Sequence, residues 1–136
     1  MKLSDCLTPE TSKELVQVQD RKGILIPNMY VRTETLAESR AARKEYNAIN
    51  GLSSAASKKE TEGLSFEELD ELAVKREESF VTRMAQFVLD HAKDSEGNPL
   101  EYESVDEILK ELKVYQITRF YLAVGDGLFG SGKFQP

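Results

Sequence analysis

Glycines and a lysine near the end of the sequence have the spacing of a phosphate-binding loop. The residues Gly127-x-x-x-x-Gly132-Lys133 match the P-loop pattern through its lysine. In a P-loop, backbone N–H groups and the N-terminus of a following helix hold the phosphates, and a Ser or Thr after the lysine holds magnesium. Phe134 replaces that hydroxyl residue, and only Gln135 and Pro136 follow it, too few for a helix. The pattern fails this structural test, and we expect residues 126–136 to form a flexible glycine-rich tail.

Other residues with possible chemistry are few. Cys6 is the one cysteine and His91 the one histidine, which excludes an intramolecular disulfide and argues against structural zinc. No local signature places a nucleophile beside His91, so it is more simply a helix-end or surface residue. The series Asp94-x-Glu96-x-Asn98 resembles the start of a calcium loop, but its sixth position is Pro99 and its twelfth is Val105, where glycine and glutamate are needed. We expect no enzyme activity, no catalytic residue, no metal and no cofactor.

Composition limits the possible partners. The 136 residues carry a formal charge of −6, with a sequence pI near 4.9. The acidic excess lies in residues 65–136, which hold 15 acidic and 8 basic residues. This charge opposes a grip on nucleic-acid phosphates and would attract a basic protein partner. No apolar stretch approaches the ~20 residues that span a bilayer, so we expect a cytoplasmic protein without a membrane segment.

The first half of the sequence predicts helices around a short extended segment. Thr8-Pro9-Glu10 is typical of a helix start, which predicts a short helix to about Gln19. Residues 24–27 and 29–31 read as two extended pieces at a sheet edge, or a small hairpin, because Pro27 cannot donate a ladder hydrogen bond. Thr33 to Leu36 opens a second helix that runs to about Asn50, with Gly51 as a left-handed stop. Residues 52–64 are small and polar, and we expect a mobile linker there.

The second half predicts longer amphipathic helices. Ser65 and Glu68 form a capping box before a helix that reaches Ala92 or Lys93. A turn at 94–99 is followed by a second capping box at 104–107 and by apolar residues at helical spacing over 108–124, with a bend near Lys113 and an end at Gly125. The expected fold is mainly α, with four to six helices and a short N-terminal extended segment or hairpin. Residues 1–125 form a single helical domain in this interpretation.

Large apolar residues on these helices are the candidate partner-binding surface. A lean domain can leave part of an apolar stripe exposed, and exposed stripes on helices usually meet another chain. We expect a charged substitution at Phe120 or Tyr121 to abolish partner binding without unfolding the chain. The full set of candidate contacts is Phe80, Met84, Phe87, Ile117, Phe120, Tyr121 and Phe129.

The layout of the chain resembles the tail assembly chaperones of lambda-like long-tailed bacteriophages. These small, acidic, mainly helical proteins often have an extended segment that leads through a Thr/Leu/Glu-rich start into a long helix, like residues 24–31 followed by Thr33-Glu34-Thr35-Leu36-Ala37-Glu38. They commonly end at a programmed −1 ribosomal frameshift. Ser131-Gly132-Lys133 can be encoded as TCG GGA AAG, which contains the lambda-type slip sequence G GGA AAG. The resemblance implies that this chain is the short, non-frameshifted product.

The resemblance also implies a function. The short product and an extended product would coat the tape measure protein in the host cytoplasm, keep it soluble and help recruit tail-tube subunits, the latter through the longer product. It implies self-association into a homo-oligomer and assigns no catalytic residues. Two alternatives stay open: a small regulatory or antitoxin-like helical interaction module, supported by the basic residues 40–44, and a nucleotide-handling enzyme built on the tail glycines.

Overall fold

The protein is mainly helical with one small sheet, as the sequence predicts. The computed structural model describes residues 1–9, 13–53 and 56–130. Within these ranges the chain forms five α-helices, one 3-10 turn and a three-stranded antiparallel sheet. The elements are a 3-10 turn at Leu3–Cys6, β1 at Leu15–Gln19, β2 at Leu25–Arg32, α1 at Leu36–Gly51, α2 at Lys58–Thr61, α3 at Phe66–His91, β3 at Ala92–Lys93, α4 at Val105–Glu111 and α5 at Val114–Phe129.

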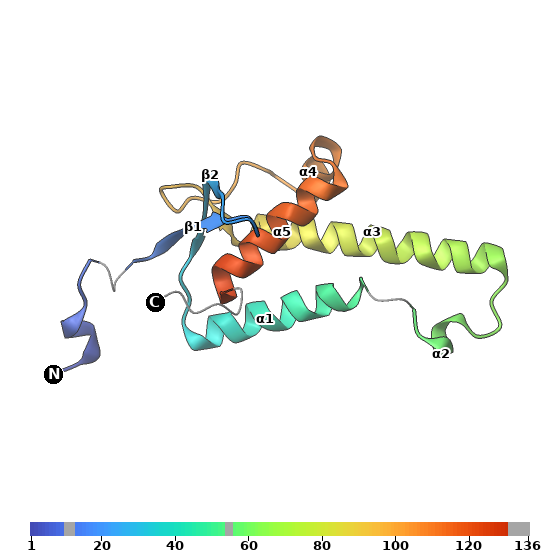
Figure 1. The fold of residues 1–136 in the computed structure, drawn as a ribbon, viewed down its shortest axis with the longest axis horizontal. Helices are drawn as coiled ribbons and strands as arrows, with labels where there is room; N and C mark the ends of the chain where they lie inside the picture. Colours follow the sequence, from blue (N-terminus) through green and yellow to red (C-terminus); the bar gives the residue numbers. More distant parts are fainter. Residues whose placement is uncertain (10–12, 54–55, 131–136) are drawn as a thin grey trace.

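These elements divide into a body and an extension. The sheet, α1, α4, α5 and the second half of α3 pack together, and α5 crosses between the sheet and the helices α1 and α3 (Figure 1). The first half of α3 continues away from this body, with α2 beside it (Figure 1). We call these packed elements the body, and we call residues 57–80 the arm.

The helix expected from Thr8 to about Gln19 is wrong. Residues 15–19 form β1 instead, which pairs antiparallel with β2 from Leu15 opposite Arg32 to Gln19 opposite Leu25. The physical reason is the sequence Leu-Val-Gln-Val-Gln, where β-branched valines alternate with glutamines and suit a pleated strand. Val18 is fully buried in the body, and this contact outweighs the helix-start signal at Pro9.

The extended structure predicted near residues 24–31 is confirmed, but it is one strand and not a hairpin around Pro27, and that strand is not an edge. β2 runs unbroken through Pro27 and is the central strand in the order β1-β2-β3. Proline is tolerated because β3 pairs only with Tyr30 and Val31, so no strand needs the missing N–H of Pro27 on that side. The pairing with β1 is irregular nearby, and Asn28 has a positive φ of 61°. Proline therefore sits where the ladder is already interrupted.

The helix starts predicted at residues 33–36, 65 and 104 are confirmed, but the left-handed conformation predicted for Gly51 is wrong. Thr35 with Glu38 caps α1, and Ser65 with Glu68 caps α3, each as a reciprocal capping box. Ser104 precedes α4, but its side chain makes no capping hydrogen bond. Gly51 is the last residue of α1 and does not adopt a left-handed conformation. The linker 52–64 contains one helical turn, α2, that the sequence did not predict.

The end of the last helix also differs from the expectation. Gly125 does not stop α5, which continues through Gly127 to Phe129, so residues 126–129 are helical and not a flexible tail. These two glycines serve close packing: a Cβ at Gly125 would lie 2.3 Å from Cε1 of Tyr46, and one at Gly127 would lie 3.0 Å from Cγ1 of Val18. The helix ends at Gly130, with φ of 71°. The rest of the expected tail, including Ser131-Gly132-Lys133, lies outside the described residues.

The core lies where α5 meets α3, α1 and the sheet. Tyr121 is 1% exposed, and its ring stacks on Tyr46 with centroids 4.8 Å apart and meets Phe87 edge-on at 5.4 Å. Its hydroxyl donates a hydrogen bond to Oδ1 of Asn50 at 2.7 Å, which satisfies this buried polar group. Burial raises the pKa of the Tyr121 phenol, so it remains a neutral donor at physiological pH. α5 is thus the central element of the body.

The contact at Gly125 gives a stability prediction. Gly125→Ala should lower the free energy of unfolding by about 1–3 kcal/mol, because the added methyl overlaps the buried ring of Tyr46. Gly51→Ala is the matched control, since nothing lies within 4 Å of its Cβ position and it should be neutral or stabilising by up to ~1 kcal/mol. Urea unfolding followed by circular dichroism measures both, and equal effects of the two substitutions would contradict this account.

Candidate partner-binding surface

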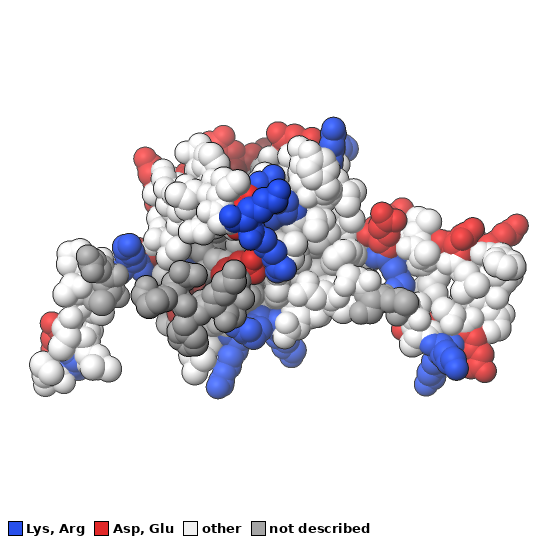
Figure 2. Space-filling model, viewed as in Figure 1, with Lys and Arg blue, Asp and Glu red and all other residues white. Residues whose placement is uncertain are grey.

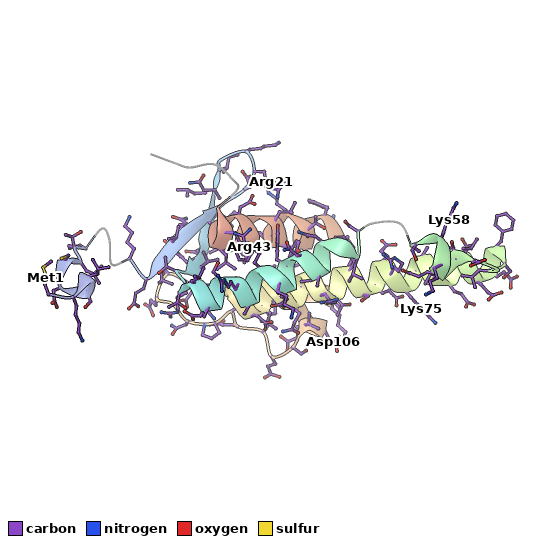
Figure 3. The ribbon with its side chains drawn as sticks, turned by 90° about the horizontal axis from the view of Figure 1, so that it is seen from below. Met1, Arg21, Arg43, Lys58, Lys75 and Asp106 are labelled. Carbon is purple, nitrogen blue, oxygen red and sulfur yellow. The ribbon has the colours of Figure 1, made fainter. Side chains whose placement is uncertain are left out.

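The arm is a long stretch of helix with little packing of its own. All buried residues of α3, namely Met84, Ala85, Phe87 and Val88, belong to its second half. Figure 3 shows the first half of α3 and α2 projecting from the body, with side chains directed into solvent around them. Helices in proteins gain most of their stability from packing an apolar face. The arm therefore presents apolar side chains that its own chain does not bury.

An apolar groove runs along the inner side of the arm. It has a volume of about 530 Å³ and lies between the end of α1, the linker, α2 and α3. An ion pair from Nη1 of Arg76 to Oε2 of Glu60, 3.2 Å long, connects α3 to α2 across it. We call this cavity the arm groove, and its apolar lining consists of Leu52, Ala56, Leu69, Leu72, Ala73 and Phe80.

The arm around this groove is acidic. Residues 57–80 contain eight acidic and four basic residues. Figure 2 shows carboxylates along the upper edge of the arm and both basic and acidic side chains on its lower side. An apolar groove with acidic surroundings fits an amphipathic helix with basic flanks, which would bury its apolar face and meet charge of the opposite sign at its edges.

Four of the seven partner-binding residues predicted from the sequence are buried in the core. Met84, Phe87, Ile117 and Tyr121 are at most 2% exposed and form the core of the body, so they cannot contact a partner in this fold. A charge at Tyr121 would disrupt that core, and the expectation that the fold survives it is wrong.

The other three candidates are partly exposed, and one belongs to the groove. Phe120 packs partly against the core, and Phe80 lines the arm groove. Phe129 packs on Tyr46 at 5.4 Å, under the guanidinium of Arg43 at 4.7 Å. The structure thus brings Phe80, but not the set as a whole, to a candidate surface.

Sequence reasoning missed Leu52 and Leu72 of the groove. Helical spacing identifies which side chains share a face, but not whether that face is covered by the same chain. Leu52 is the first residue of a polar linker and is not part of any helical spacing of apolar residues. The one usable signal was the pair of helix starts at Ser57 and Ser65, both with a hydroxyl accepting the N–H three residues later, which would have predicted a folded turn inside the linker.

A second cavity holds the chain's single histidine. It has a volume of about 430 Å³, and His91 lies there with Nδ1 3.9 Å from Oε1 of Glu34 and Nε2 3.6 Å from Oε2 of Glu45. Burial raises the pKa of Glu34, while the nearby His91 opposes that change. Among the described residues, no group of three His, Cys, Asp or Glu side chains is arranged to hold a metal ion. Cys6 is exposed in the N-terminal segment and lies in neither cavity.

The two motifs that resembled ligand loops have structural roles where they are described. Oδ1 of Asp94 accepts hydrogen bonds from the N–H groups of Glu96 and Asn98 at 2.8 and 2.9 Å. These bonds, first that from Asn98, lower the pKa of Asp94 and fix the predicted turn before Pro99. Gly127 lies inside α5 against the sheet, whereas the first glycine of a P-loop precedes a helix. Gly132 and Lys133 lie outside the described residues.

Glu34 and Glu38 give opposite predictions for the pH dependence of stability. Because the folded pKa of Glu34 is raised above 4.5, its ionised form costs stability at neutral pH and this cost vanishes as the pH falls below that value. Glu34→Gln should therefore be more stable than the parent at pH 7, with the difference lost near pH 4.

Glu38 has a lowered pKa, first because its carboxylate accepts the N–H of Thr35. Glu38→Gln should therefore be less stable than the parent at pH 7, and this deficit should also shrink in acid. Urea midpoints between pH 4 and 7 measure both, and the same sign for the two variants at pH 7 would refute the assignment.

No known protein family, curated protein or solved structure matches this chain. Within the part of the chain that the structure describes, no helix has the length and apolar content to cross a membrane. The functional argument therefore depends on the surfaces of the molecule itself, and the arm groove is the larger and more apolar of the two cavities described above.

Proposed function

We propose that the protein is a tail assembly chaperone of a long-tailed bacteriophage, which binds the tape measure protein in the host cytoplasm and keeps it soluble. The observation that carries this proposal is the arm groove: an apolar cavity on an acidic extension whose own chain leaves it uncovered. The resemblance in layout to that family supplies the partner. Recruitment of tail-tube subunits belongs to the longer, frameshifted product in this proposal.

The geometry of the arm suits a long helical partner. A helix laid along α3 would place an apolar residue on every turn against Leu69, Leu72 and Phe80, which are themselves one or two turns apart. Each groove holds a short stretch, so a single contact is weak. Many copies along one partner would still give high overall avidity, because each further site binds at a high effective concentration.

The acidic surface explains how a coated complex would stay dispersed. Covering an apolar helix with chains of formal charge −6 gives the complex a large net charge of one sign. Like-charged complexes repel one another and remain in solution. The same charge attracts basic flanks on the partner, so the acidic arm serves both binding and dispersal.

Co-expression with a tape measure protein from the same genome tests the groove. Leu72→Lys should reduce the soluble yield of the tape measure protein and weaken its binding by about tenfold or more, since loss of a central apolar anchor usually costs over 1 kcal/mol. Tyr115→Lys is the matched control, because Tyr115 is an apolar aromatic side chain, 65% exposed, on α5 outside the groove. Circular dichroism of both variants establishes that the fold is retained.

Two results would reject this function. Equal soluble yields for the parent, Leu72→Lys and an empty-vector control would show that the chain does not protect the tape measure protein. Equal losses for Leu72→Lys and Tyr115→Lys would show that any binding surface lies elsewhere.

A further inference from the structure

A second exposed face on α3 lies away from the arm groove. The groove is lined from α3 by residues at 69, 72, 73, 76, 77 and 80, whereas Glu67, Asp70, Glu71, Val74 and Glu78 occupy the other side of the helix. All five are exposed. We call these five residues the α3 stripe, which combines one apolar side chain with four carboxylates.

α1 has an exposed face of the opposite charge. The helix packs into the body through Ala42 and Ile49, so its other side faces outward. That side carries Arg40 and Lys44 one turn apart, and Leu36, 68% exposed, one turn before them. We call Leu36, Ala37, Arg40, Lys44 and Ala48 the α1 stripe. Figure 2 shows basic side chains along the lower edge of the body, where Figure 1 places α1.

The charges of these two stripes have no partners within one copy. Among the described residues, Glu67, Asp70, Glu71 and Glu78 form no ion pair, and neither do Arg40 and Lys44. The groove side of the same helix differs, because Arg76 there is paired with Glu60. Both stripes point away from the contacts that hold their own helices, so they cannot meet in a single chain.

We propose that the α3 stripe of one copy packs against the α1 stripe of a second copy. Carboxylates of one helix would then lie beside Arg40 and Lys44 of the other, and Val74 would be covered together with Leu36. Pairing of two α3 stripes is disfavoured, because it would bring eight carboxylates together. The contact joins two different surfaces, so each copy has one of each free and the assembly grows as a ring or a chain.

This assembly is independent of the arm groove. The groove stays open when the α3 stripe is covered, because the two lie on different sides of the helix. A row of copies joined through the stripes would therefore present a row of grooves. The inference holds whatever the groove binds.

Charge reversal tests the contact on the full chain by sedimentation velocity. The parent should self-associate at low ionic strength and dissociate as salt rises to about 0.5 M, where the Debye length falls to a few Å. Asp70→Lys with Glu71→Lys should weaken association at least tenfold, and so should Arg40→Glu with Lys44→Glu. An equimolar mixture of the two double variants should associate again, because each supplies the charge that the other lacks. Glu101→Lys with Glu103→Lys is the control for the acidic pair, because it changes the net charge by the same amount as Asp70→Lys with Glu71→Lys, at exposed positions outside both stripes.

Each of the following results would contradict the proposal. A parent chain that stays monomeric at low salt overturns it. So does unchanged association in either double variant, or an equal loss in the Glu101 and Glu103 control, which would reflect net charge only. Failure of the mixture to associate, with helical circular dichroism intact in both variants, would show that the two stripes do not face each other. Tape measure binding by Leu72→Lys is measured separately, so either proposal can fail without the other.

Discussion

The close approach of Gly125 to the ring of Tyr46 is the constraint on which the body depends. No side chain separates α5 from Tyr46 there, so Tyr46 can stack on Tyr121 and still contact Phe87. Two residues further, on the opposite face of the helix, Gly127 brings α5 close to Val18 and Val31 of the sheet. Helices α1 and α3 are thus held by one face of α5 and the sheet by the other, and a chain with a lean apolar content can still form a well-packed core.

The arm lacks the close packing of the body. The large side chains of α3 that pack in the core lie at Met84 and beyond, while no residue of α3 before Met84 is buried. The capping box at Ser65 and the ion pair between Arg76 and Glu60 keep the arm helical, but neither buries much apolar surface. The molecule is therefore divided into a part that is complete by itself and a part whose apolar residues are arranged for contact with something else.

The sequence was a good guide wherever local chemistry decides the outcome. The caps at Thr35 and Ser65, the turn at Asp94 and the break near Lys113 follow from a few neighbouring residues, and each was predictable. It was a poor guide where a contact between residues far apart in the sequence determines the local structure. Residues 15–19 become a strand because β2 pairs with them, and Gly125 stays helical because Tyr46 lies 79 positions earlier in the chain. The prediction of the binding surface failed for the same reason. Tyr121 and Leu72 are both apolar residues on amphipathic helices, and only the fold shows which of them is covered.

The continuation of α5 to Phe129 determines where this helix ends relative to the arm. The C-terminal end of α5 lies on the side of the body away from the tip of the arm (Figure 1), and Gly127 packs there against the sheet. Because α5 packs against α1, α3 and the sheet, the end of this helix cannot move independently of them. The molecule therefore has two separate ends, an acidic one that carries the groove and one where the last described helix stops, with the packed body as the spacer between them.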